Sequence, residues 1–301
     1  MIGTTTPPVR PATPLEPRSP RVKGPRASRG RRVVIASLLT LVSVAFVYPF
    51  LWLISASLKP RAQTFDNRLI PSEWAARNYT EVLSTTKTLL WLGNSVLVGV
   101  VAAAAVTISS AIVAFGFAYF RFRGRGVLFG LVLATMMLPA AVTMVPTYLI
   151  WDGLGLASTQ VPLWAQNLFG SAFYIFLIRQ FFLAVPRELF EAARVDGASH
   201  ATMFWRIAMP ICVPALIVTF VFELRASWTD LIKPLIYLRD PDLYTLPRGL
   251  KAVLDQFGQG GESKWEIVLT ASAIATIPMI IAFFLAQRYI IDGIATTGRK
   301  G

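Results

Sequence analysis

Residues 191–214 read EAARVDGASHATMFWRIAMPICVP and lie between two apolar segments long enough to cross a membrane. Just before them, Pro186 and Glu188 predict the first turn of a short helix, because proline gives up no hydrogen bond there and an acid is favoured at a helix N-terminus. Gly197 is predicted to end that helix in a left-handed cap. Ser199 is predicted to be the N-cap of a second short helix. The sequence therefore predicts a polar, helical insert between two spans.

The residue types and spacing of this insert resemble the EAA loop of ABC-importer permeases, where the loop forms coupling helices that dock into a groove on a separate ATPase subunit. The resemblance implies coupling helices at about residues 186–208. It also implies the following ATPase-coupling residues: Glu191, Ala192, Ala193, Asp196, Gly197, Ala198, Phe204, Ile207 and Pro210. The alternative interpretation is an ordinary amphipathic cytoplasmic loop.

The composition is that of an integral membrane protein. Of 301 residues, 54% are hydrophobic and 15% are charged, and the mean hydropathy is +0.57, whereas about a quarter of the residues in a soluble domain are charged. The formal net charge of +13 does not indicate nucleic-acid binding, because the basic residues are distributed by membrane side and not gathered into one patch. A single cysteine excludes an internal disulfide, and a single histidine cannot build a metal site.

Six segments are predicted to be transmembrane helices, for which about 20 residues at about 1.5 Å each are needed; the fifth has only 16 uncharged residues, which end at Glu223. The predicted spans are 33–58, 88–120, 127–151, 163–184, a fifth that starts near Ile207, and 267–287. Pro139 and Pro146 are predicted to break the hydrogen-bond ladder of the third span. The sequence thus predicts an all-α integral membrane fold, with polar loops at 59–87 and, after the fifth span, up to about Lys264.

The basic residues predict the orientation. Residues 1–32 are expected to be a disordered cytoplasmic tail, because they contain eight Arg or Lys, seven prolines and almost no large apolar side chain. Residues 33–301 would then form the transmembrane domain, with both termini and the polar insert in the cytoplasm. Of the 29 Lys and Arg residues, 18 lie on this proposed inner side and 11 outside, as the positive-inside rule requires.

No catalytic site is visible in the sequence. There is no GxxxxGK[ST] phosphate-binding loop, and His200 alone cannot complete a nucleophile–histidine–acid set. We therefore expect no enzymatic activity, catalytic residue, metal or cofactor in this chain, and we expect ATP and Mg²⁺ to be bound by a separate ATPase.

The fifth span is the best candidate for a solute pathway. Glu223 is predicted to lie about 20 Å along it, counted at about 1.5 Å per residue, and a charge at such depth usually faces a bundle interior or an aqueous cavity. The proposed pathway residues are Glu223, Ser227, Trp228 and Asp230, since sugar sites commonly combine carboxylates with an aromatic platform. The alternative is that Glu223 hydrogen-bonds a neighbouring helix or a partner subunit.

Further stretches extend the resemblance over residues 33–301. SLKPRAQTF at 57–65, ARNYTEVL at 76–83 and QRY at 287–289 are similar to carbohydrate-type permeases, in the position of the second permease of maltose-type importers. The resemblance implies the type I ABC-importer fold and import of a mono- or oligosaccharide through the cytoplasmic (inner) membrane. It also implies three kinds of partner: a second, different permease, two ATPase subunits and an extracellular substrate-binding protein.

Two alternatives stay open at this point. One is a permease of the same superfamily for a non-sugar solute such as a polyamine, a phosphonate or glycerol phosphate. The other belongs to a different class, a membrane-embedded enzyme or a passive channel, for which the sequence offers no supporting residues.

Overall fold

The computed structural model describes residues 29–258 and 263–297, and within them the regular structure is entirely helical. Three helices are long and apolar enough to cross a membrane, and the number rises to six if each of three bent helix pairs forms one span. The predicted all-α membrane fold is therefore confirmed. The helices are α1 (Arg29–Ser57), α2 (Arg77–Thr85), α3 (Thr88–Tyr119), α4 (Arg125–Ala134), α5 (Ala140–Gly153), α6 (Val161–Trp164), α7 (Ala172–Ala184), α8 (Arg187–Val195), α9 (His200–Met203), α10 (Met209–Ile211), α11 (Val213–Thr229), α12 (Ile232–Tyr237), α13 (Leu246–Phe257) and α14 (Trp265–Thr297).

The chain divides into two compact units, residues 1–49 and 50–301. In the first unit, helix α1 begins at Arg29, four residues before the predicted span, because arginine is a good helix former and does not interrupt the helix. Its large apolar side chains, such as Leu38 and Phe46, are exposed, as expected of a helix whose solvent is lipid. The prediction of a disordered tail at 1–28 lies outside the described residues.

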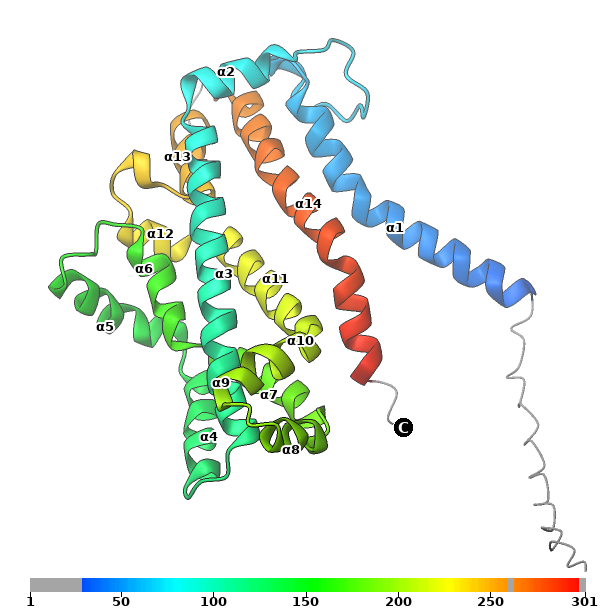
Figure 1. Cartoon of the computed structure of the whole chain (residues 1–301). Coiled ribbons are helices and arrows are strands. Elements are labelled where there is room, and N and C mark those ends of the chain that lie inside the picture. Colours follow the sequence, from blue (N-terminus) through cyan, green and yellow to red (C-terminus); the bar gives the residue numbers. More distant parts are fainter. Residues whose placement is uncertain (1–28, 259–262, 298–301) are drawn as a thin grey trace, which may run out of the picture. The chain divides into compact units, whose positions relative to one another are not determined.

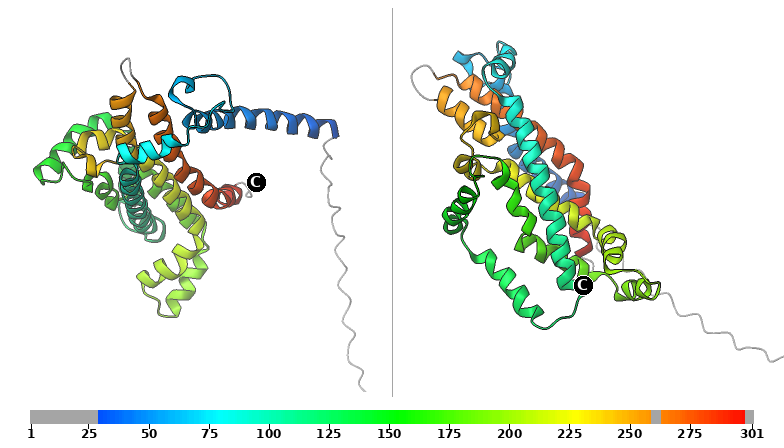
Figure 2. Two further views of the ribbon diagram at one scale, coloured as in Figure 1. Left: turned by 90° about the horizontal axis from the view of Figure 1, so that it is seen from above. Right: turned by 60° about the vertical axis from the view of Figure 1, so that its left-hand side comes forward.

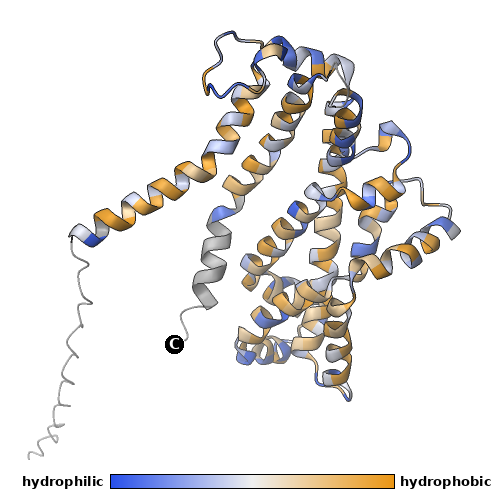
Figure 3. Cartoon of the chain, turned by 180° about the vertical axis from the view of Figure 1, so that it is seen from behind, coloured by the Kyte–Doolittle hydropathy of each residue, from blue (hydrophilic) through white to orange (hydrophobic). Residues whose placement is uncertain are grey.

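Helix α3 is the central element of the second unit. It packs against α7 and α11, and α11 packs in turn against α14 (Figure 1). Small side chains on α3 permit this close approach: a Cβ atom at Gly99 would lie 3.0 Å from Leu224 Cδ1 on α11. Apolar residues dominate the long helices, and hydrophilic residues gather mainly at the two ends of the bundle (Figure 3). The core therefore forms between α3, α7 and α11, with α14 packed on the far side of α11.

Three of the predicted spans are bent. Pro139 ends the first arm of the third span, and α4 and α5 diverge by 99° there (Figure 2); Pro146 lies inside α5 without ending it. The fourth span bends by 40° between residues 169 and 172, where Gly170 has φ +79°. Proline and glycine are the residues that interrupt a helical ladder most readily.

The predicted start of the fifth span near Ile207 is wrong. Helix α11 begins at Val213, after a 78° bend at Cys212. Pro214 is the reason, because proline lacks the N–H needed within a helix but fits its first turn. Glu223 consequently lies ten residues from the start of α11, about 15 Å along the helix rather than about 20 Å.

The two segments predicted as outer loops contain helices. Residues 59–87 include α2, and residues 230–264 include α12 and the amphipathic α13. Helix α13 lies directly on Trp91, since a Cβ atom at Gly249 would come within 2.1 Å of the indole ring. The candidate membrane span within α14, Trp265–Leu285, agrees with the predicted sixth span to within two residues at each end, and the helix itself continues to Thr297.

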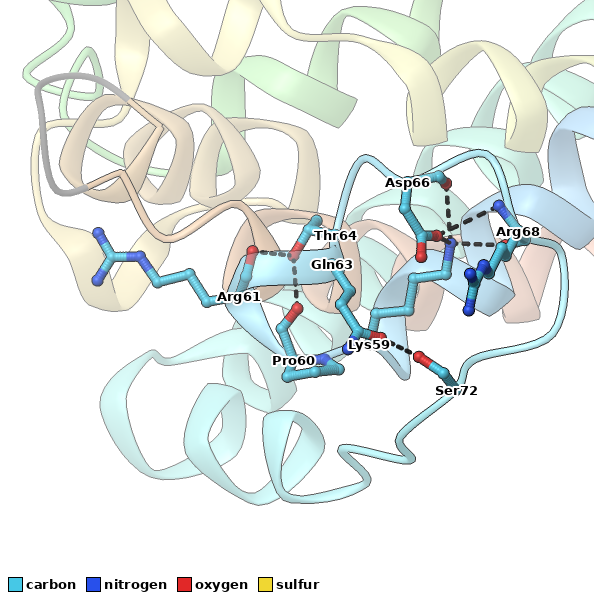
Figure 4. A network of polar contacts seen from close by, with 8 residues as sticks. All are labelled: Lys59, Pro60, Arg61, Gln63, Thr64, Asp66, Arg68 and Ser72. Atoms are coloured by element: carbon cyan, nitrogen blue, oxygen red, sulfur yellow. Dashed lines mark hydrogen bonds and ion pairs between the residues drawn. The ribbon is translucent and has the colours of Figure 1, made fainter.

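A buried lysine organises the segment between α1 and α2. The side chain of Lys59 is 0% exposed, and its Nζ donates to Asp66 Oδ1 at 2.5 Å, to Asp66 O at 3.0 Å and to Arg68 O at 2.7 Å (Figure 4). Lys59 is the main cause of a lowered pKa at the Asp66 carboxyl. Asn78 ties this segment to α2, because its Nδ2 donates to Ser57 O and Lys59 O at 3.0 and 2.9 Å. The motif at 57–65 thus folds into an ordered structure.

Candidate functional site

The polar insert folds as the sequence predicts. Helix α8 ends in a Schellman motif, in which Ala198 N donates to Ala193 O at 2.9 Å and Gly197 N donates to Arg194 O at 3.1 Å. Gly197 has φ +79°, a left-handed conformation that glycine adopts without a steric cost. Ser199 Oγ then caps α9 by accepting a hydrogen bond from Thr202 N at 3.1 Å. The two short helices are therefore held in a fixed turn by local hydrogen bonds.

A π-helical turn, Phe204–Ala208, follows α9 and continues into α10. The residue that was predicted to couple here, Phe204, is buried, and its ring lies 5.3 Å from that of Phe115 on α3. Phe190 on α8 packs on the same ring at 6.1 Å. Burying each phenylalanine contributes roughly 1.5–3 kcal/mol. The two rings anchor the insert to the end of α3.

The predicted coupling residues separate into three groups by their exposure. Phe204 is an anchor and is inaccessible to a partner. Ala193, Ala198 and Ile207 are half-buried against the same core. The exposed members, which a second subunit can reach, are Glu191, Ala192, Asp196, Gly197 and Pro210.

Helix α8 has two distinct faces. Arg187, Glu191 and Arg194 recur three and four residues apart and line a cavity between the insert and the bundle. Leu189, on the opposite side of α8, is 46% exposed, and Val195 in the last turn of the helix is 88% exposed. Trp205 on the π-helical turn is also 52% exposed. The sequence analysis did not identify Trp205, although its place beside the buried Phe204 predicts that it points away from the core.

The second candidate region is a cavity of about 180 Å³ beside α11. It brings together three of the four predicted pathway residues, Glu223, Ser227 and Asp230. Lys233 and Thr245 also line it, and Lys233 Nζ lies 3.7 Å from Asp230 Oδ2. The cavity is therefore polar and carries both signs of charge.

Glu223 both lines this cavity and bonds a neighbouring segment. Asn167 Nδ2 donates to Glu223 Oε1 at 2.7 Å, and the Tyr174 hydroxyl interacts with the same carboxylate. Asn167 is itself held by α3, since Ser109 Oγ donates to Asn167 O at 2.8 Å. The two interpretations of Glu223 from the sequence are thus compatible. Arg225 is exposed.

Trp228 is not at the cavity. Its side chain is buried at 7% exposure in a core cluster with Trp91 and Val98. The helical wheel explains this, because Trp228 is about 100° around α11 from Ser227 and therefore faces a different neighbour. The geometry assigns Trp228 to packing. Trp228 therefore does not supply the aromatic platform that was predicted for the solute pathway.

The remaining chemically distinctive side chains have structural positions. Cys212 is buried at the bend before α11. The ring of His200 packs edge-on against Tyr119 and Phe120 at 5.9 and 5.1 Å. Within the described residues, no three His, Cys, Asp or Glu side chains gather closely enough to hold a metal ion.

Comparison with known proteins extends this description. Residues 108–296 match the model of a family described as "Binding-protein-dependent transport system inner membrane component". The chain is 29% identical to the arabinooligosaccharides transport system permease protein AraQ of Bacillus subtilis (strain 168), over 90% of this chain and 96% of that protein. It is 30% identical to the sn-glycerol-3-phosphate transport system permease protein UgpE of Brucella abortus (strain 2308), over 86% of this chain and 94% of that protein.

A solved structure has the same fold. A chain in the crystal structure of a bacterial ABC transporter involved in the import of the acidic polysaccharide alginate superposes with a TM-score of 0.78. The sequence identity is 25%, and the match covers 88% of this chain and 99% of that chain. The family match spans α3 to α14 and therefore includes both the polar insert and the cavity beside α11.

Proposed function

Because this chain belongs to the family of binding-protein-dependent transport system inner membrane components, we propose that it is the permease subunit of an ATP-driven ABC importer. In this proposal it forms half of the transmembrane pathway for a mono- or oligosaccharide that an extracellular binding protein delivers. The chain is embedded in the cytoplasmic (inner) membrane, with both termini and the polar insert on the cytoplasmic side.

The observation that carries this proposal is the construction of the insert. It is anchored by Phe190 and Phe204, while apolar side chains on its outer surface, chiefly Leu189 and Val195, have no covering element among the described residues. Exposed apolar side chains on a rigid support are typical of a protein interface. The occupant we propose is an ATPase subunit, which binds ATP and Mg²⁺ and carries out hydrolysis that this chain does not perform.

The bend at Cys212 supports a mechanical role for the insert. Helix α10 meets α11 there at 78°, and α11 carries Glu223, Ser227 and Asp230 at the cavity. A displacement of the anchored insert is therefore transmitted directly to the helix that lines the proposed pathway. This is how closure of two ATPase subunits would switch the permease pair between inward- and outward-facing states.

Sugar is the solute class that the cavity beside α11 and the relatives favour together. The carboxylates of Glu223 and Asp230 can accept hydrogen bonds from the hydroxyl groups of a solute, and the Ser227 hydroxyl can donate one. These three side chains therefore suit a neutral polyhydroxylated solute. The arabinooligosaccharide relative points to the same class.

The first experiment is a pull-down of the tagged full-length chain from detergent. We expect recovery of a Walker-motif ATPase and a second, different permease, with ATP hydrolysis stimulated by a sugar-loaded binding protein. A chain that purifies alone and moves solute without ATP would overturn the proposal. The variant Val195→Asp is expected to reduce the recovered ATPase, whereas Val195→Ile, which keeps an apolar β-branched side chain, is the matched control.

A second solute class has specific support, because the glycerol-phosphate relative is as similar to this chain as the sugar relative. The two classes differ in charge. Stimulation of the recovered ATPase by a binding protein loaded with glycerol phosphate, and not by one loaded with sugar, would replace sugar with an anionic solute and leave the importer assignment intact.

A further inference from the structure

A cavity of about 410 Å³ lies between the polar insert and the ends of α3 and α7. Aromatic rings form much of its wall: Tyr119 stacks on Phe115 at 5.1 Å and contacts Phe190 at 5.3 Å. Phe182 on α7 completes this wall, 5.8 Å from Phe115. Phe115 and Phe190, which hold the insert against α3, are part of this wall, so the cavity adjoins the attachment of the insert.

Three arginines line this cavity: Arg121 after α3, and Arg187 and Arg194 on α8. They face a single carboxylate, that of Glu191, so the lining carries a net positive charge. Among the residues that the structure describes, none of the three guanidinium groups has an ion pair or a hydrogen-bond partner. Arginines that converge on one concave surface without partners are suited to bind an anion, because the guanidinium fork matches the geometry of phosphate.

The helix dipole of α8 favours Arg194, which lies in the last turn, but not Arg187. Arg187 stands in the first helical turn, where the helix dipole disfavours a positive charge. Arg187, Glu191 and Arg194 form one face of α8, opposite to the exposed Leu189. The cationic lining therefore points away from the exposed Leu189, while Glu191 belongs both to this lining and to the residues proposed for ATPase coupling.

The position of the cavity indicates the source of the anion. It lies where the apolar helices α3 and α7 end, and Leu183, which is exposed near the end of α7, lines it beside the arginines. An anionic amphiphile could place its apolar chain on the apolar wall and its charged headgroup among the arginines. Basic pockets between transmembrane helices on the cytoplasmic side are known to accept phospholipid headgroups.

We infer that this cavity binds a phosphate-bearing ligand through Arg121, Arg187 and Arg194. The shared chemistry is a phosphate group in a cationic, aromatic-walled cavity, and its two possible sources are the headgroup of an anionic phospholipid and soluble phosphate. Binding at this site does not depend on which solute the chain transports.

The test uses the full-length chain in its purified assembly, incubated in detergent with phosphatidylglycerol or with phosphatidylcholine. Retained lipid is counted by mass spectrometry. The informative variant is Arg121→Gln, and the matched control is Arg123→Gln, an exposed arginine in the same loop that does not line the cavity. We expect wild type and the control to retain phosphatidylglycerol, and Arg121→Gln to bind it about tenfold more weakly, the effect of losing one charge-assisted hydrogen bond.

A second variant and a second probe separate the remaining outcomes. Arg194→Lys keeps the charge but not the planar fork, and we expect it to weaken retention less than Arg121→Gln does. If lipid retention is equal in all variants but inorganic phosphate raises the melting temperature of wild type and not of Arg121→Gln, the ligand is a soluble phosphate. Equal retention of both lipids, or equal losses in Arg121→Gln and Arg123→Gln, with no effect of phosphate, would overturn the inference.

Discussion

Asn167 Nδ2 lies 2.7 Å from Glu223 Oε1 and joins the bent fourth span to α11 at the edge of the polar cavity. This hydrogen bond holds the carboxylate of Glu223 in place, while the cavity leaves part of that carboxylate accessible. The same pair of residues therefore contributes to helix packing and to the chemistry of the proposed pathway. The two contributions can be separated experimentally.

Glu223→Gln is expected to reduce solute uptake by about tenfold or more, because it removes the charge that faces the cavity but keeps an oxygen that can accept from Asn167. The measurement is uptake at matched membrane levels. Asn167→Ala is the complementary variant, and it is expected to lower the melting temperature because the buried partner loses its donor, at about 1–3 kcal/mol. Normal uptake by Glu223→Gln would assign the carboxylate to packing alone.

Gly197→Asp is expected to uncouple ATP hydrolysis from transport while the protein stays in the membrane. A Cβ atom at Gly197 would meet no atom within 4 Å, so the substitution strains the left-handed backbone by only about 1–2 kcal/mol. The added charge, however, lies at the exposed turn between α8 and α9. Gly197→Asn is the control, since asparagine tolerates this conformation and adds no charge. Both uptake and ATPase activity are measured, and coupled transport by Gly197→Asp would contradict the assignment.

Lys59→Met is expected to destabilise the segment between α1 and α2, because two backbone carbonyls lose their buried donor at about 1–3 kcal/mol each. Lys59 also lowers the pKa of Asp66. A carboxyl with a lowered pKa stabilises the folded state above its ordinary pKa of 3.8, and this contribution disappears as the pH falls through the lowered value. The melting temperature of wild type should therefore fall below about pH 4. The melting temperature of Lys59→Met should not show this fall. An identical pH dependence in both proteins would show that the pair is not linked to stability.

Gly249→Ala is expected to displace α13 from Trp91, since the new methyl group would lie 2.1 Å from the indole ring. Overpacking of this kind costs about 1–3 kcal/mol, and each kcal/mol corresponds to about 2–4 °C in a domain of this size. Thermal unfolding of the purified chain is the measurement. Gly93→Ala is the matched control, because a Cβ atom there would meet nothing within 4 Å. Equal melting temperatures for the two variants would mean that α13 does not rest on Trp91.

Local signals in the sequence were sufficient for several elements. The cap at Gly197, the N-cap at Ser199 and the break at Pro139 were all predicted correctly. Each depends on the conformational preference of one residue and its immediate neighbours, so no knowledge of distant contacts is needed. The start of α11 was misplaced because apolar composition continues from Ile207 through the bend, and composition does not record where a ladder of hydrogen bonds is interrupted.

The segments predicted as outer loops were harder to predict in detail, since α2, α12 and α13 are short and mixed in polarity. Helix α13 rests on Trp91, and a contact between residues so distant in sequence leaves no periodic signal that identifies the partner. Trp228 was misassigned for the same reason. Its place beside Ser227 and Asp230 in the chain suggested a shared site, but the helix turns its side chain into the core.

The sequence by itself determined the membrane class, the number of candidate spans and the polar insert, because these follow from residue composition, segment length and local capping. Only the tertiary structure decided which side chains meet. It brought Asn167 to Glu223, placed Lys233 at the same cavity, and gathered Arg121 with Arg187 and Arg194 around another. Asn167 and Glu223, like Arg121 and the two arginines of α8, are more than 50 residues apart in the chain, and their convergence depends on the close packing of α3 against α7 and α11, which no local pattern encodes.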